Sequence, residues 1–86
     1  MKGAAEKRAF VASLINKLNM AAIRVDLETF FGQESCPNSK HKIISKLLSR
    51  CEWLTDHLDE LSISDLEYSK SGMQEVADWS YLNIRF

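Results

Sequence analysis

The chain has 86 residues, of which 45% are apolar and 27% are charged, and its net charge is −1. This length suits a single helical domain, which we expect to span residues 1–86. Three glycines and one proline are too few for the many turns of an all-β fold. A domain of this size is marginally stable alone, and oligomerisation is a common remedy.

The sequence shows no membrane or secretory segment. No apolar run approaches the roughly 18 residues that a membrane-spanning helix needs, and residues 1–8 lack the apolar core of a signal peptide. Cys36 and Cys51 are therefore expected to be free thiols in a reducing compartment. We expect a cytoplasmic protein with no membrane partner.

The first predicted helix covers residues 4–31. Apolar residues recur there in alternating steps of three and four, which marks one face of a helix. Near its end, Asp26 and Glu28 lie where the helix dipole disfavours acids. Two forms stay open: one helix to residue 31, or a helix that stops by Val25 and resumes as a short turn. The predicted buried stripe is Val11, Leu14, Leu18, Ala21 and Val25.

Residues 32–38 form the clearest predicted loop. Gly32 suits the end of a helix, and Pro37 disfavours helix at the residue before it. Asn38 or Ser39 is a suitable N-cap for the next helix. Because the connection is short, we expect the two flanking helices to form an antiparallel hairpin.

The central helix, residues 38–61, carries the strongest pattern in the chain. Its apolar residues follow a strict heptad, which predicts packing against a partner helix. Ile43, Leu48 and Trp53 widen the apolar surface beyond what one partner helix covers. We therefore expect a homo-oligomer, a dimer or tetramer, assembled through this heptad stripe. The stripe is Ile44, Leu47, Cys51, Leu54, Leu58 and Leu61.

A shorter helical segment is predicted after residue 62. Ser64 and Glu67 fit a capping box that starts it, and the pattern leaves open whether residues 63–80 form one helix or two. Residues 81–86 alternate as an extended tail does, with Leu82, Ile84 and Phe86 expected to pack against a neighbour. The predicted fold is thus all-α: two long antiparallel helices and a shorter C-terminal helical segment that assemble through helix–helix seams.

No arrangement of residues typical of catalysis or metal binding is present. The spacings among Cys36, His41, Cys51 and His57 include none of the close pairs that bind zinc. Cys51 and His57 point in different directions on one helix, so they do not form a nucleophile–base pair. Phosphate-binding loops and common hydrolase motifs are also missing. We expect no enzyme activity, no catalytic residue, no metal and no cofactor.

The second half of the chain is acidic and contains aromatic residues, which either anchor a partner or pack in the core. An acidic field steers a basic partner, and aromatic residues are enriched at interface hot spots. We expect a partner-binding site for a repressor or another regulatory protein with a basic surface. The alternative is a solvated helical face. The predicted site is an acidic rim of Asp56, Asp59, Glu60, Glu75 and Asp78, with Trp79 and Tyr81 as anchors.

Two other functions stay open. A small DNA-binding regulator is suggested by four cations at the start of the central helix, which resemble those of a recognition helix. However, the preceding turn is longer than is usual in a helix-turn-helix, and the pI of about 6.1 is low for a DNA-binding domain. A purely structural oligomerisation module is the third possibility. The four cations are Lys40, Lys42, Lys46 and Arg50.

In its small size, its helical apolar seams and its acidic, Trp-containing second half, the chain resembles the small antirepressors of temperate phages. The resemblance implies an oligomeric protein in the host cell cytoplasm that binds a phage repressor and keeps it off operator DNA, which promotes prophage induction. It implies no direct nucleic-acid binding. No functional residue is assigned by this resemblance.

Overall fold

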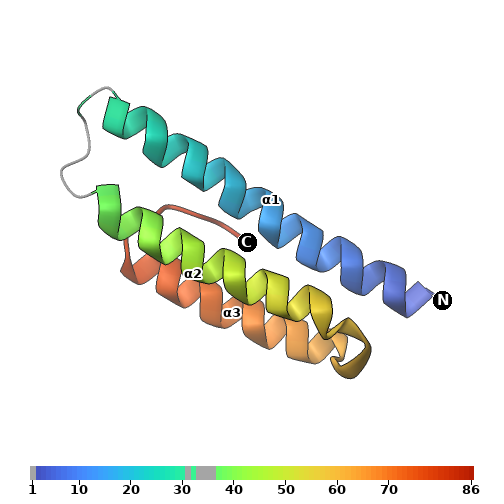
Figure 1. Cartoon of the computed structure of the whole chain (residues 1–86). Coiled ribbons are helices and arrows are strands. Elements are labelled where there is room, and N and C mark those ends of the chain that lie inside the picture. The colour runs from blue at the N-terminus through green and yellow to red at the C-terminus, as the bar shows by residue number, and fades with distance from the viewer. Residues whose placement is uncertain (1, 31, 33–36) are drawn as a thin grey trace.

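The computed structural model describes residues 2–30, 32 and 37–86. They form three α-helices, namely α1 (Lys2–Phe30), α2 (Pro37–Asp56) and α3 (Ile63–Trp79), with a 3₁₀ turn η1 (Leu58–Glu60) before α3. No strand occurs in these ranges. The predicted all-α fold, with two long antiparallel helices and a shorter third helix, is confirmed (Figure 1).

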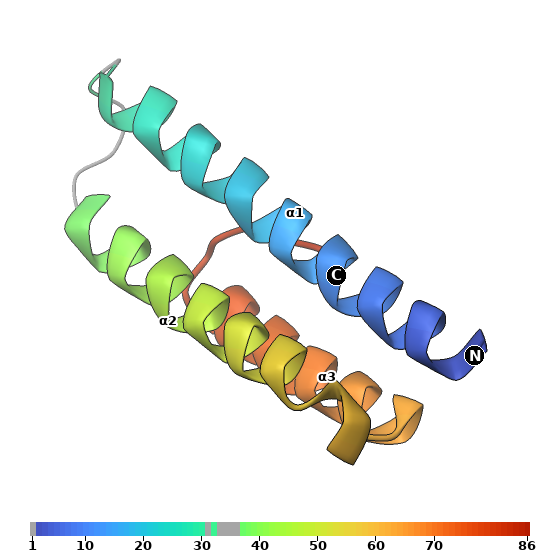
Figure 2. The same ribbon diagram turned by 45° about the vertical axis from the view of Figure 1, so that its right-hand side comes forward.

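The three helices lie side by side in an elongated bundle of 47 × 19 × 18 Å. A helix of 29 residues is about 44 Å long, so α1 alone accounts for the length of the molecule. After α3, the chain turns back and runs toward α1, as Figure 2 shows. None of the helices in the described part of the chain is long and apolar enough to span a bilayer.

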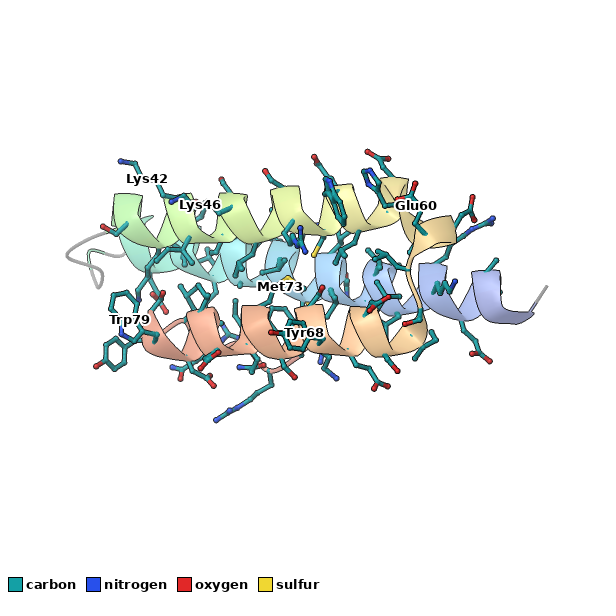
Figure 3. All side chains as sticks on the ribbon, turned by 90° about the horizontal axis from the view of Figure 1, so that it is seen from below. Lys42, Lys46, Glu60, Tyr68, Met73 and Trp79 are labelled. Atoms are coloured by element: carbon teal, nitrogen blue, oxygen red, sulfur yellow. The ribbon has the colours of Figure 1, made fainter. Side chains whose placement is uncertain are left out.

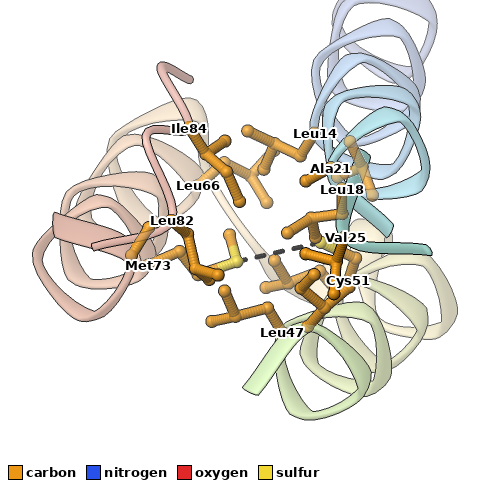
Figure 4. Close-up of a cluster of buried hydrophobic side chains, with 14 residues drawn as sticks. Leu14, Leu18, Ala21, Val25, Leu47, Cys51, Leu66, Met73, Leu82 and Ile84 are labelled. Carbon is orange, nitrogen blue, oxygen red and sulfur yellow. Dashed lines mark hydrogen bonds between the residues drawn. The ribbon is translucent and has the colours of Figure 1, made fainter. Parts of the chain in front are cut away.

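One continuous core joins the three helices and the C-terminal tail (Figure 4). All five residues of the predicted α1 stripe are buried, as are the first four of the α2 stripe. Leu58 and Leu61 are partly buried and pack against the same core. The remaining buried side chains come from α3 and the tail: Leu66, Met73, Ala77, Leu82 and Ile84.

The acids at the end of α1 face the basic start of α2. Asp26 Oδ1 lies 3.1 Å from His41 Nε2, and Glu28 Oε2 lies 3.9 Å from Lys40 Nζ. These contacts offset the unfavourable position of the acids near the C-terminus of a helix dipole. Of the two forms left open, the uninterrupted helix is the one observed, and α1 continues to Phe30.

Both ends of α2 differ from the prediction. The helix begins at Pro37, not after an N-cap at Asn38 or Ser39, and proline is well suited to the first helical position. It ends at Asp56, and η1 replaces the predicted last turn to residues 61–62. The tighter 3₁₀ turn still directs Leu58 toward the core, so apolar spacing alone does not reveal the change. Residues 33–36 of the predicted loop lie outside the described residues, and Gly32 has φ of 71°.

A capping box starts α3, as predicted, but it lies two residues earlier in the sequence than expected. The Asp65 backbone N–H donates to Ser62 Oγ over 3.1 Å, and the Ser62 N–H donates to Asp65 Oδ2 over 2.9 Å. These hydrogen bonds lower the pKa of Asp65. The Ser62 cap places Leu66 at the fourth helical position, where its side chain is buried. A cap at Ser64 would instead make Leu66 the second helical residue. From there α3 runs as one helix to Trp79.

The C-terminal tail packs on the chain's own helices. Its predicted alternation is observed, because Leu82 and Ile84 are buried and Phe86 is partly buried against the core. The Gln74 side chain holds the tail as a neighbouring strand would: Nε2 donates to the Ile84 carbonyl over 2.6 Å, and Oε1 accepts from the Phe86 N–H over 2.8 Å. The tail thus closes the space between α3 and α1 in the same molecule.

Candidate protein-interaction surfaces

The predicted partner-binding residues are all exposed, but the structure divides them into two groups. Three of them are at the end of α2 and in η1, and four are at the C-terminal end of α3. Figure 3 shows Glu60 and Trp79 at opposite ends of the bundle. A helix of 17 residues separates the groups by about 25 Å, so they do not form one rim. The first group is Asp56, Asp59 and Glu60; the second is Glu75, Asp78, Trp79 and Tyr81.

The first acidic group has basic neighbours that a local reading of the sequence misses. Asp59 lines the same surface depression as Lys7 and Arg8, and Lys7 Nζ donates to the Leu58 carbonyl over 3.3 Å. The N-terminal turns of α1 therefore bring cations beside η1. These cations reduce the negative field at this end of the molecule.

The second group, which we call the Trp79 patch (Glu75, Asp78, Trp79 and Tyr81), combines acids with two prominent aromatic side chains. Trp79 is 82% exposed and Tyr81 is 83% exposed. Asp78 accepts a hydrogen bond from Gln74 over 2.8 Å and lies 3.8 Å from the exposed Arg85 guanidinium. The patch is therefore acidic at Glu75 and partly neutralised at Asp78.

The backbone at Tyr81 is strained. Its φ of 58° is in the left-handed region, which costs a bulky residue of order 1–3 kcal/mol. The Tyr81 N–H donates to the Asp78 carbonyl and the Leu82 N–H donates to the Ala77 carbonyl, each over 3.1 Å, a helix-ending motif in which glycine is usual. A tyrosine here gains no burial in return, so its side chain serves no evident purpose within the fold.

A second surface, the α2/α3 groove, was not predicted from the sequence. It is a hollow of about 260 Å³ between the two helices. In Figure 3, Met73 lies between the two ribbons and Tyr68 lies in front of α3. Tyr68 is 84% exposed and Val76 is 45% exposed. The signal was present, since Tyr68, Gly72 and Val76 follow one another in steps of four. The lining residues are Leu47, Arg50, Tyr68, Ser69, Gly72, Met73 and Val76.

The α2 side of this groove is basic. Lys42, Lys46 and Arg50 are exposed and one helical turn apart, and Figure 3 shows the two lysines at the same end as Trp79. The Arg50 guanidinium lies 4.6 Å from the centre of the Trp53 ring, which also stacks on His57 at 4.0 Å. Lys40, the fourth cation of the predicted set, is next to Glu28 instead.

The heptad stripe, predicted to join copies of the chain, is used within the molecule. Ile44, Leu47, Cys51 and Leu54 lie in the core beneath α1, α3 and the tail. An interface between folded copies therefore needs a different surface, unless copies exchange helices. A heptad specifies that a helix has partners, but not whether they belong to the same chain.

Cys51, the cysteine that lies in the described ranges, is part of the core. Cys51 is buried, its Sγ lies 3.8 Å from Met73 Sδ, and burial raises the pKa of its thiol to about 11. The thiol is thus protonated at neutral pH and is neither nucleophile nor metal ligand. Within the described residues, no group of three or more potential metal ligands occurs. Cys36 lies outside them.

Comparison of the chain with protein-family models, curated proteins and solved structures finds no match.

Proposed function

We propose that this chain is a non-enzymatic protein that binds a regulatory protein in the cytoplasm and inhibits it. The observation that carries the proposal is the pair of aromatic side chains in the Trp79 patch. Trp79 and Tyr81 are both more than 80% exposed. The strained backbone at Tyr81 is not offset by burial of the Tyr81 side chain. Strained residues concentrate at functional sites, and Trp and Tyr are enriched in binding hot spots.

The chemistry of the patch favours a partner with a basic rim around an apolar pocket. Glu75 and Asp78 would steer such a partner, and the two aromatic side chains would provide the short-range contacts. We propose that the patch, without the three acids at the other end of the bundle, forms the partner site. Of these three acids, Asp59 lines a depression together with Lys7 and Arg8, and its position is better explained by the packing of α1.

The resemblance to small temperate-phage antirepressors gives this proposal its most specific form. In that form, the partner is a phage repressor, and binding covers the basic surface with which the repressor contacts operator DNA. Release of the operator then promotes prophage induction. The small all-helical fold and the acidic, aromatic patch support this form of the proposal. Self-association as a dimer or tetramer is part of it.

A second candidate function is direct DNA binding. It is favoured by the exposed row of Lys42, Lys46 and Arg50 on α2, which has the spacing to follow a phosphate backbone. Three cations are a small footprint, however, and Arg50 is also engaged with the Trp53 ring. The net charge of −1 adds no attraction for DNA.

The proposal predicts that removing both aromatic side chains weakens partner binding at least ten-fold. Immobilised chain would capture its regulator from host lysate, mass spectrometry would identify it, and the regulator would then be bound to its DNA duplex. We expect the wild-type chain to release the duplex and the Trp79→Ala/Tyr81→Ala variant to lose at least ten-fold in potency, about 1.4 kcal/mol.

Ile23→Ala is the matched control, because Ile23 is 59% exposed on the outer side of α1. This variant should release the duplex as the wild type does. Failure to capture any DNA-binding regulator, or equal potency of the double variant, would contradict the proposal and favour a purely structural module.

A further inference from the structure

We propose that the α2/α3 groove is a self-association site whose occupant is the same groove of a second copy of this chain. In this dimer, the two-fold axis runs parallel to the helices, so that α2 of each copy lies on α3 of the other. The inference rests on the self-association included in the proposed function, and it does not depend on which regulator is bound.

The groove exposes apolar surface that the chain itself does not cover. Tyr68 and Val76 stand at its α3 edge, 84% and 45% exposed, above Leu47 and Met73. At Gly72, an added Cβ would meet no atom within 4 Å. The centre of the groove therefore has room for side chains from another molecule, flanked by residues that gain from being buried.

The two helices that border the groove carry opposite charges on their exposed sides. On α2, Arg50 lines the groove, and Lys46 and Lys42 precede it in steps of four, all three exposed. On α3, Glu75 is three residues after Gly72 and four before Trp79, so it lies on the outer side of the same surface. One face of the molecule thus offers a basic strip along one helix and an acidic group along the next.

This charge pattern selects one of the two face-to-face arrangements. A two-fold axis across the helices would place α2 on α2, with the two basic strips opposed, and like charges in contact are unfavourable. An axis parallel to the helices places α2 on α3 of the other copy. Lys46 then approaches Glu75 of the second copy, which brings opposite charges together.

Self-complementarity is why the occupant is a second copy of this chain. A two-fold interface brings the same patch of both copies together, so the patch must contain both halves of every contact. The groove meets this condition. Its apolar centre packs on the apolar centre of the second copy, and the basic side of α2 lies against the acidic side of α3 of that copy. In this dimer Glu75 pairs with the second copy, so Asp78 is the acid of the Trp79 patch that remains for the regulator. The Trp79 and Tyr81 side chains, both more than 80% exposed, lie beyond the end of the groove and stay available to it.

The test is the mass of the purified chain by light scattering at micromolar concentration, with no regulator present. We expect twice the chain mass of 9.8 kDa for the wild type and the monomer mass for Val76→Asp, both with the same helical circular dichroism. Ile23→Asp, a matched change at an exposed apolar residue of α1, should stay dimeric.

Charge exchange makes the test specific to the arrangement. Lys46→Glu and Glu75→Lys should each weaken dimerisation about ten-fold, and the two changes together should restore it, because they re-form the pair with its signs reversed. A wild-type monomer, a dimer that survives Val76→Asp, or no recovery in the double variant would overturn the inference. A wild-type chain that dimerises but does not release the duplex from the regulator would instead count only against the proposed function.

Discussion

Leu54→Asp is expected to unfold the chain. Leu54 is fully buried in α2, and truncation of a buried leucine to alanine alone costs roughly 2–5 kcal/mol. The aspartate adds a charge in an apolar site, with no partner to hydrogen-bond it. Domains are stable by about 5–15 kcal/mol in total, and small ones are at the low end, so the substitution removes most or all of the stability. Far-UV circular dichroism at 25 °C should show the loss of helix.

The matched control for this change is Leu27→Asp. Leu27 is 53% exposed on α1, so the same substitution there should leave the helical signal unchanged. A Leu54→Asp chain that remained helical but had the monomer mass would contradict the structure. It would mean that the heptad stripe joins copies of the chain and does not form the core of one molecule.

Ile84→Ala is expected to cost roughly 2–5 kcal/mol, the range for truncation of a buried aliphatic side chain. Ile84 is buried near the end of the tail, and its carbonyl is held by Gln74 Nε2. A tail that merely lay on the surface would contribute little to stability. Urea denaturation followed by circular dichroism gives the free energy of unfolding from the shift of the midpoint.

Arg85→Ala provides the comparison for this second variant. The Arg85 side chain is 86% exposed and lies next to Ile84, and its contact with Asp78 is 3.8 Å long, so removing it should change stability by less than about 0.5 kcal/mol. Equal midpoints for the Ile84 and Arg85 variants would show that the tail does not belong to the core.

The helices were predictable because each one has a periodic apolar stripe. All residues of the predicted α1 stripe are buried, and so are Ile44 to Leu54 of the α2 stripe. The end of α2 was not predictable, because Leu58 keeps its approach to the core through a 3₁₀ turn. The choice between Ser62 and Ser64 as N-cap also could not be made from the sequence, because an acid follows each serine three residues later, Asp65 and Glu67.

The candidate site was predictable in part. Trp79 and Tyr81 were named as possible anchors, with core packing as the alternative, and both are exposed. The division of the acids was not predicted, because it depends on α3 running back along α2 (Figure 1). The uneven distribution of charge along the sequence was interpreted as an acidic surface that attracts a basic partner. In the fold, part of this asymmetry is compensated within the molecule, because Lys7 and Arg8 line the same depression as Asp59. Such cross-helix neighbours are not visible in local sequence.

Titration of a labelled random-sequence duplex with the purified chain separates action on a regulator from action on DNA most directly. At about 0.15 M salt, roughly physiological, we predict no retarded band on a native gel at micromolar protein. A retarded band would contradict the proposed function if its affinity fell steeply with salt and if Lys42→Glu/Lys46→Glu abolished it, because those changes would identify the α2 cations as phosphate contacts.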